Sequence, residues 1–257
     1  MSPRANAAYE RFTRSTEDMC VAYASVNYAL HESDDPTGRL FDAGRGCAVF
    51  SQRVLRFTGF SAERLDHASD EVLFVLAGSG ALLMEEIGHE VAPGTAAFAR
   101  AGQSWSVAGA EGLSILSVLV HDPEPATCAC AVIDLAASER QTATAGRQFV
   151  LGVGPESGCL SVTQFIGLIP PGRAPDHFHT YDEVIYVLEG EGLLEIAGEQ
   201  APLRPGSSVH LPARLVHCLA NTGSAEMRVL GVFRPAGSPA EAYYPDGTLA
   251  LPPAERS

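Results

Sequence analysis

Apolar residues in this chain fall into short runs that are separated by turn-forming residues. From about residue 47 onward, stretches 48–57, 71–77, 160–169 and 184–188 are rich in valine, leucine, isoleucine and phenylalanine. Side chains of a strand alternate between its two faces, and β-branched and aromatic residues favour that geometry. Short runs of this kind with glycine and proline between them predict antiparallel strands. We therefore expect an all-β sandwich or barrel.

The same arrangement occurs twice along the chain. Glu71 begins an apolar run that repeats at Glu183, and the Pro-Gly turn that ends in Gly94 repeats at Gly206. Both pairs are separated by the same interval, since 183 − 71 = 112 and 206 − 94 = 112. An internal repeat without a net gap indicates two copies of one fold.

The second copy carries side chains that are typical of metal ligands. His177, His179 and Glu183 have the same parity, so they share one face if the chain stays extended. His217 opens a later strand, after a bend that begins at Pro212. Imidazoles and a carboxylate that converge inside a barrel bind divalent transition metals. The alternative is an unrelated surface pair of histidines; four ligands with the intervening turns favour the metal site.

This pattern resembles the two signature motifs of the cupin superfamily. The resemblance is carried by His-x-His-x3-Glu-x6-Gly, a Pro-Gly turn and Pro-x4-His-x3-Asn, that is, by Gly172, His177, His179, Glu183, Gly190, Pro205, Gly206, Pro212, His217 and Asn221. The chain departs from the family pattern by one residue fewer between Gly172 and His177, and by Arg214 where glycine is common. The resemblance implies two tandem cupin barrels (double-stranded β-helix, jelly-roll) with a metal site in the second.

The first copy lacks the complete ligand set. When the four ligand positions of the second copy are moved back by 112 residues, they fall on Leu65, His67, Glu71 and Trp105. Two potential ligands beside a bulky indole hold a divalent ion poorly. We interpret Leu65 and Trp105 as core residues of a degenerate cupin barrel with a structural role. A small ligand pocket beside Trp105 is the alternative.

The repeat and its flanks predict five stretches along the chain. These are an N-terminal leader (1–45), the degenerate cupin barrel (46–122), a linker with the first strands of the second half (123–155), the metal-binding cupin barrel (156–235) and a C-terminal tail (236–257).

Several residues of the second copy are candidates for binding a substrate. Simple alternation along the strand turns the side chains of Gln164 and Ile166 inward. Ile185 and Leu219 are apolar neighbours of the metal ligands and keep the site dry. Arg214 places a cation near the barrel mouth. Tyrosines in the tail either pack on the barrel or cover its opening. The candidates are Gln164, Ile166, Ile185, Arg214, Leu219, Tyr243 and Tyr244.

Charge and composition exclude several classes of function. The formal net charge of −14 argues against a nucleic-acid partner and against binding to an anionic membrane surface. All 17 basic residues are arginine, which excludes Schiff-base chemistry on a lysine amine. The polar N-terminus lacks a signal peptide core and no apolar stretch is long enough to cross a bilayer, so we expect a cytoplasmic protein. Exposed sheet edges are compatible with a homodimer.

We therefore expect a metal-dependent enzyme that acts on a small oxygen-rich metabolite. Its cofactor is one divalent transition metal ion (Fe, Mn, Ni, Zn or Cu), and the ligand types do not select among these. Similarity to quercetin dioxygenase-type cupins implies an oxidoreductase. Glu183 is a metal ligand in most of the resembling proteins, and in some dioxygenases of the superfamily the equivalent glutamate also takes a substrate proton; the sequence leaves both roles open. The alternatives are a non-redox isomerase, decarboxylase or aminohydrolase, and a metabolite-binding cupin without enzymatic activity.

Overall fold

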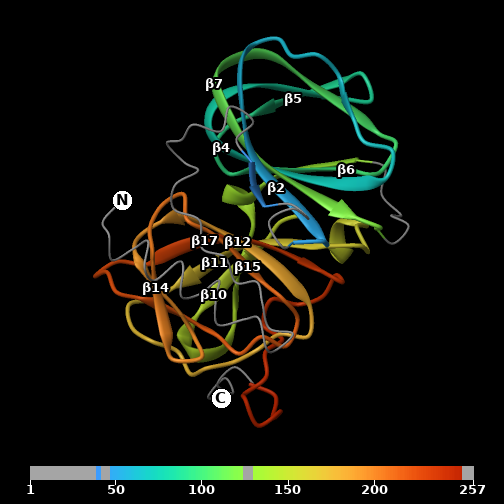
Figure 1. Ribbon diagram of the computed structural model, residues 1–257. Coiled ribbons are helices and arrows are strands. Elements are labelled where there is room, and N and C mark those ends of the chain that lie inside the picture. Colours follow the sequence, from blue (N-terminus) through green and yellow to red (C-terminus); the bar gives the residue numbers. More distant parts are fainter. Residues whose placement is uncertain (1–38, 42–46, 124–129, 251–257) are drawn as a thin grey trace. The chain divides into compact units, whose positions relative to one another are not determined.

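The structure is a computed structural model that describes residues 39–41, 47–123 and 130–250. The described part of the chain divides into two compact units (Figure 1). The first unit comprises the described part of Asp34–Ser138 together with Leu151–Gln164, and the second comprises Glu139–Val150 and the described part of Phe165–Ser257. Most of the predicted leader lies outside the described residues.

Strands dominate both units, as predicted. The helical segments within the described ranges are three single 3-10 turns, η2 (Leu135–Ala137), η3 (Thr144–Gly146) and η4 (Pro155–Ser157). None of the helices in this part of the chain has the length and apolar character required to span a bilayer.

The first unit is built on one antiparallel sheet, which contains eight strands when only the described residues are counted. Its strands are β1 (Arg39–Phe41), β2 (Phe50–Gly59), β3 (Arg64–Leu65), β4 (Ser69–Met84), β5 (Ile87–Val91), β6 (Thr95–Ala99), β7 (Ser104–His121) and β8 (Cys130–Asp134). The order is β1-β2-β7-β4-β6-β8, with β3 on β7 and β5 on β4. The long strands β4 and β7 wrap around a core that includes Leu73, Ile115 and Trp105.

The second unit contains a six-stranded and a three-stranded sheet within the described ranges, in the orders β15-β12-β17-β11-β10-β9 and β14-β13-β16. The strands are β9 (Arg140–Thr142), β10 (Gln148–Leu151), β11 (Thr163–Ile169), β12 (Asp182–Glu189), β13 (Gly192–Ile196), β14 (Glu199–Leu203), β15 (Ser208–Leu211), β16 (Cys218–Asn221) and β17 (Met227–Arg234). One apolar cluster draws residues from both sheets, including Val187, Leu194 and Val229. Burial of that cluster holds the two sheets together.

The turn predicted at the end of the His-x-His-x3-Glu motif is present. Gly190 has φ +84°, a backbone conformation that side-chain-bearing residues rarely adopt. A Cβ at this position would lie 2.9 Å from the Cα of Met227. Both the dihedral angle and the close approach of β17 therefore require glycine.

The pairing of β4 with β6 repeats in the pairing of β12 with β15 at the 112-residue offset, whereas β7 and β17 differ by 114, since Glu71 pairs with Leu119 and Glu183 with Phe233. Glu71 pairs with Ala99 as Glu183 pairs with Leu211, and 99 + 112 = 211. In the segments just before β4 and β12, the offset between equivalent residues of the two units is 113. In the first unit Arg64 pairs with Trp105, whereas in the second His177 pairs with His217. Since 105 + 112 = 217 but 64 + 113 = 177, the first unit has one additional residue between these points.

That additional residue corrects the expected role of Leu65. Leu65 is 49% exposed and is not a core residue, whereas Trp105 is buried as predicted. A shift of one residue turns every side chain of an extended segment to the opposite face. Arg64 therefore occupies the place of His177, and Asp66 corresponds to His179.

Candidate metal centre

Two short pieces of backbone pairing place the histidines. His177 and His217 exchange both main-chain hydrogen bonds, with N–O distances of 3.0 and 2.9 Å. The carbonyl oxygen of His179 accepts a hydrogen bond of 2.7 Å from the backbone N–H of Arg214. Arg214 has φ +67°, in the left-handed region, which accounts for the glycine that is common there in the family pattern.

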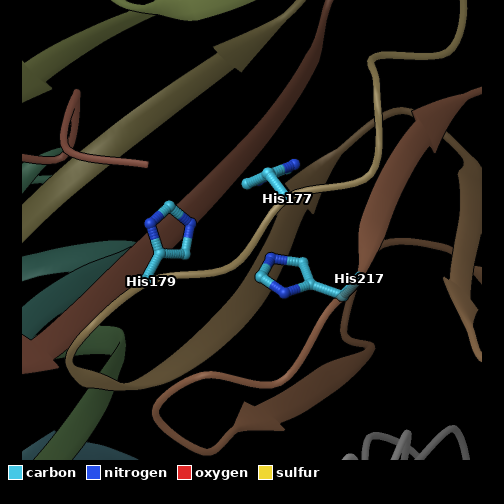
Figure 2. Close-up of side chains that lie close together, drawn as sticks. All are labelled: His177, His179 and His217. Carbon is cyan, nitrogen blue, oxygen red and sulfur yellow. The ribbon is translucent and has the colours of Figure 1, made fainter. Parts of the chain in front are cut away.

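The three imidazole rings converge (Figure 2). The ring centroids are 5.1 Å apart for His177 and His179, 4.6 Å for His177 and His217, and 5.4 Å for His179 and His217. One ring nitrogen from each lies within 4.8 Å of the other two. This spacing is suited to a single ion bound between them.

Backbone carbonyl groups fix the orientation of all three rings. The Nδ1 atoms donate hydrogen bonds to the oxygens of Pro175 (3.0 Å), Glu241 (2.8 Å) and Leu215 (2.8 Å), for His177, His179 and His217 respectively. A carbonyl oxygen only accepts, so each Nδ1 carries the proton and each Nε2 keeps its lone pair. Metal-ligating histidines are held in this way. The donor set therefore fits a divalent transition metal.

Burial keeps these imidazoles neutral. It lowers the pKa of His177 to about 3 and that of His179 to about 4, with a further contribution from the positive charge of Arg147. Burial, followed by the neighbouring histidines, lowers the pKa of His217 well below its usual value. Neutral histidine is the form that coordinates a metal, so protonation competes little with binding at neutral pH.

Glu183 lines the same cavity but is not part of the group of three ring nitrogens. Its side chain is buried, and burial raises its pKa to about 8 against the opposing charge of Arg147. The absence of a side chain at Gly231 makes room for it, because a Cβ there would lie 2.9 Å from Glu183 Oε1. Glu183 thus faces the site without crowding its centre.

The cavity that contains the histidines has a volume of about 70 Å³. Its walls are largely apolar and include Phe165, Ile185, Leu219 and Val229. Pro239 and Ala242 of the C-terminal tail complete the lining. A cavity far smaller than the roughly 300–1,000 Å³ of drug-sized ligand pockets admits only a small molecule.

Arg147 contributes a cation to this cavity. Its Nη2 donates a hydrogen bond of 2.6 Å to the carbonyl oxygen of Leu219. Burial lowers the pKa of Arg147, while the charges of Cys218 and Glu183 oppose that change. An arginine retains its charge under such conditions, so a guanidinium group faces the histidine site.

The structure brings some of the predicted substrate residues to the cavity and leaves others away from it. Ile185 and Leu219 line it, and Gln164 and Ile166 do not. On β11 the lining side includes Phe165 and Ile169, so the alternation is shifted by one residue from the expected one. Gln164 instead belongs to the first unit and donates a hydrogen bond of 3.2 Å to the carbonyl oxygen of Leu73.

Arg214, Tyr243 and Tyr244 also lie outside the cavity lining. Arg214 lines a separate hollow of about 670 Å³ on the second unit. Tyr243 stacks on Phe178 with ring centroids 5.5 Å apart, which corresponds to the packing alternative for the tail. The backbone N–H of Tyr244 donates to the carbonyl oxygen of Thr248 within the tail.

A second group of ligand-type side chains borders that hollow. It consists of Asp176, Glu195 and Cys218. Arg173 bridges its carboxylates, with nitrogen–oxygen distances of 2.6 Å to Asp176 and 2.5 Å to Glu195. The guanidinium group already provides the positive charge that a metal ion would bring.

The side chains of the cavity that sequence reasoning missed include Arg147, Phe165 and Tyr181. Tyr181 shares the parity of His179 and Glu183, and its ring stacks on His179 with centroids 4.7 Å apart. The shared parity could have identified Tyr181 as a cavity residue from the sequence. Arg147 lies in the stretch expected to connect the two copies, where no pattern pointed to the site.

Comparison with known proteins agrees with this architecture. Residues 165–233 match the family model described as Cupin domain. Among curated proteins, the polyketide synthase CurC of Streptomyces cyaneus is 32% identical over 80 residues, which cover 30% of this chain and 49% of that protein. The chain spans about half the length of the curated relatives it matches, from 42% to 65%.

Solved structures show the same fold at low identity. Oxalate decarboxylase of Bacillus subtilis, studied for its Mn(II) centres, has a TM-score of 0.61 at 12% identity and covers 74% of this chain and 70% of its own. Protein YlbA of E. coli has a TM-score of 0.64 at 13% identity, covering 76% and 81%. The chain therefore has the all-β jelly-roll fold of the cupins, and residues 165–233 match the Cupin domain model.

Proposed function

We propose that the second unit is the active site of a metal-dependent enzyme that acts on a small oxygen-rich metabolite, most consistently as a dioxygenase-type oxidoreductase. One observation carries this proposal: three imidazoles converge, two of them buried and that of His179 half-buried, and each is fixed through Nδ1 to a backbone carbonyl oxygen. His177, His179 and His217 would hold the ion. A divalent metal there supplies a Lewis acid that orients and polarises a substrate oxygen.

Glu183 has two roles compatible with its position. As a carboxylate it completes the ligand set that the cupin resemblance implies. As a buried carboxyl group with a pKa raised to about 8, it exchanges a proton with a substrate near neutral pH. In both roles the apolar walls formed by Ile185 and Leu219 exclude water and strengthen the electrostatic interactions.

Arg147 supports an anionic substrate. Its guanidinium group is positioned by the hydrogen bond to the carbonyl oxygen of Leu219 and lines the cavity. Arginine pairs with carboxylates through two parallel hydrogen bonds. Together with the cavity of about 70 Å³, this favours a small carboxylic acid over a larger or neutral metabolite.

The test combines metal analysis with oxygen uptake. The purified protein is stripped of metal, reloaded separately with Fe(II), Mn(II), Ni(II), Zn(II) or Cu(II), and supplied with small hydroxy- and oxo-carboxylic acids in an oxygen electrode. We expect one ion per chain and oxygen uptake with at least one metal and substrate. His179→Ala is expected to abolish both, and absence of stoichiometric metal binding in the wild type would contradict the proposal.

A non-redox reaction is the second candidate, and the raised pKa of Glu183 favours it. An isomerase, decarboxylase or aminohydrolase needs a group that gives and takes protons near neutral pH. Turnover that continues under argon identifies this class. Stoichiometric metal and carboxylate binding without turnover identifies a metabolite-binding cupin.

A further inference from the structure

The first unit contains a charged cluster inside its barrel at the place that the metal site occupies in the second. We call Arg53, Arg64, Glu71, Trp105 and Ser117 the arginine cluster. The pairing of Arg64 with Trp105 corresponds to that of His177 with His217. A cation and an indole have therefore replaced two imidazoles.

Arg53 points to the barrel interior. It lies on β2 with the same parity as Leu55 and Phe57, which pack against the core of the first unit. Its pairing partner on β7 is Ser117. In the second unit Gly231 takes the place of Ser117, since Leu73 pairs with Ser117 and Ile185 (73 + 112 = 185) pairs with Gly231; the Phe165 ring lies against Gly231 and lines the histidine cavity. Next to this position Arg53 thus supplies a cation where the second unit has an apolar ring.

Both carboxylate oxygens of Glu71 accept a hydrogen bond within the arginine cluster. Its Oε2 accepts a hydrogen bond of 2.7 Å from Trp105 Nε1, and its Oε1 accepts one from the Ser117 hydroxyl group. Arg53 Nη2 lies 3.9 Å from Glu71 Oε1, a long ion pair. The Arg64 guanidinium carbon lies 5.3 Å from the centre of the Trp105 ring, within the range of a cation–π interaction.

The cluster has more positive charge and more hydrogen-bond donors than its own residues satisfy. Two guanidinium groups and one carboxylate leave an excess of one positive charge (2 − 1 = 1). The Nε atoms of both Arg53 and Arg64 are buried and have no hydrogen-bond partner among the described residues. Asp66 is not among the charges that act on Arg64, and its Oδ1 accepts from the backbone N–H groups of Ala68 and Ser69.

An unmade hydrogen bond of a buried charged group is costly, and like charges at close range add to that cost. Burial lowers the pKa of Arg64, and the charge of Arg53 lowers it further, with Glu71 opposing. Such an arrangement is stabilised by a ligand that brings one negative charge and several acceptor atoms. A carboxylate fits because its two oxygens match the donor geometry of arginine.

We propose that the first unit binds a small organic monocarboxylate between Arg53 and Arg64, above the Trp105 ring. This site is separate from the histidine centre and does not depend on the function proposed for it. The Arg53 side chain retains 32% exposure, so the arginine cluster is not sealed from solvent. The first unit therefore binds an anion at the place where the second unit holds its cation site.

The chain provides its own reporter, because Trp105 is its single tryptophan. The experiment titrates the full chain with acetate, pyruvate and benzoate while tryptophan emission is recorded, with chloride at equal ionic strength as the reference. We expect a saturable change in emission for the carboxylates and only a weak, linear change for chloride. If none of the carboxylates causes a saturable change in the emission of the wild-type protein, the proposal is overturned.

Charge-removing variants locate the site. Arg53→Gln and Arg64→Gln are each expected to weaken binding by about tenfold or more, because each removes a charge-assisted hydrogen bond. Arg56→Gln is the matched control, since Arg56 lies on the same strand with opposite parity and is exposed. Equal affinity in all three variants would place the ligand elsewhere and overturn the proposal.

A second control separates this site from the histidine centre. His177→Ala is expected to remove metal and to leave the tryptophan titration unchanged. If the emission change disappears in His177→Ala but persists in Arg64→Gln, the carboxylate binds in the second unit and the proposal fails. Circular dichroism of each variant verifies that it is folded.

Discussion

Arg147 and Leu219 are joined by a hydrogen bond of 2.6 Å from the guanidinium group to the backbone carbonyl oxygen, two residues beyond His217. The bond ties a cation from the segment before β10 to the strand that follows the histidine. The guanidinium group therefore has a fixed place in the cavity before any ligand enters. Preorganised donors of this kind bind at a smaller entropic cost than mobile ones.

Replacement of Arg147 by glutamine is expected to weaken the binding of small carboxylates by about tenfold to a hundredfold, since one charge-assisted interaction is lost. Metal content should remain the same. Titration calorimetry of the metal-loaded protein with oxalate measures the first quantity and mass analysis of bound metal the second. Arg140→Gln is the control, because Arg140 is exposed and pairs with Glu226. Unchanged oxalate affinity in Arg147→Gln would remove Arg147 from the site.

His217→Ala is expected to eliminate stoichiometric metal while leaving the protein folded. One of three converging imidazoles is lost, and two remaining ligands bind a divalent ion far more weakly. His67→Ala, which changes an exposed histidine of the first unit, should retain metal. Metal analysis after dialysis compares the two variants. Full metal retention in His217→Ala would show that the ion is bound elsewhere.

Metal-stripped protein is expected to lose stability as the pH rises from about 6.5 to about 8; below this range the lowered pKa values of His177, His179 and His217 act in the opposite direction. The folded-state pKa of Glu183 is raised to about 8 from 4.5, so the folded state keeps a proton that the unfolded chain has released. Stability falls with pH wherever the folded state binds more protons. Urea unfolding across this range measures the effect. Glu183→Gln should flatten the dependence and Glu191→Gln, an exposed control, should not.

Gly231→Ala is expected to disrupt the histidine cavity. The new Cβ would lie 2.3 Å from Cε1 of Phe165 and 2.9 Å from Oε1 of Glu183, so both side chains must shift. We expect metal affinity to fall, and a crystal structure of the variant to show a displaced Phe165 ring. Gly237→Ala is the control, because its nearest neighbour would be 3.8 Å away. Equal metal affinity in the two variants would mean that Glu183 and Phe165 do not shape the site.

Trp105→Phe is expected to cost about 1–3 kcal/mol of unfolding free energy, because Glu71 loses a buried hydrogen-bond donor. Trp105→Ala should cost more, about 3–5 kcal/mol, since a large cavity is added to the lost bond. Urea unfolding followed by circular dichroism compares both with the wild type. Equal losses in the two variants would show that packing of the ring contributes little.

The positions of the three histidines were accessible from sequence because they depend on local rules. The two-residue spacing of His177 and His179 sets their common face, and the fixed 112-residue interval exposes the repeat. The Pro212 bend then brings His217 opposite His177. Each of these steps uses strand parity or turn chemistry, and both act over a few residues.

One error arose where one residue shifts the register. The additional residue before Glu71 turned Leu65 outward and brought Arg64 inward. Parity arguments have no means of detecting such a shift within an irregular segment. On β11, which is a regular strand, alternation did not decide which face meets the cavity, and Phe165 and Ile169 line it rather than Gln164 and Ile166. Arg147 and the tail residues reach the cavity only through tertiary packing, which leaves no periodic pattern in the sequence.

The chain enters and leaves the two units more than once. Between 130 and 250 it changes unit after Ser138, after Val150 and after Gln164. All eight described strands of the first sheet lie between residues 39 and 134, whereas β9 and most of β10 of the second unit precede Leu151–Gln164, a segment that belongs to the first unit. No single cut in this part of the chain therefore yields both units intact: a cut after Ser138 or Val150 removes Leu151–Gln164 from the first unit, and a cut after Gln164 removes two strands from the six-stranded sheet of the second.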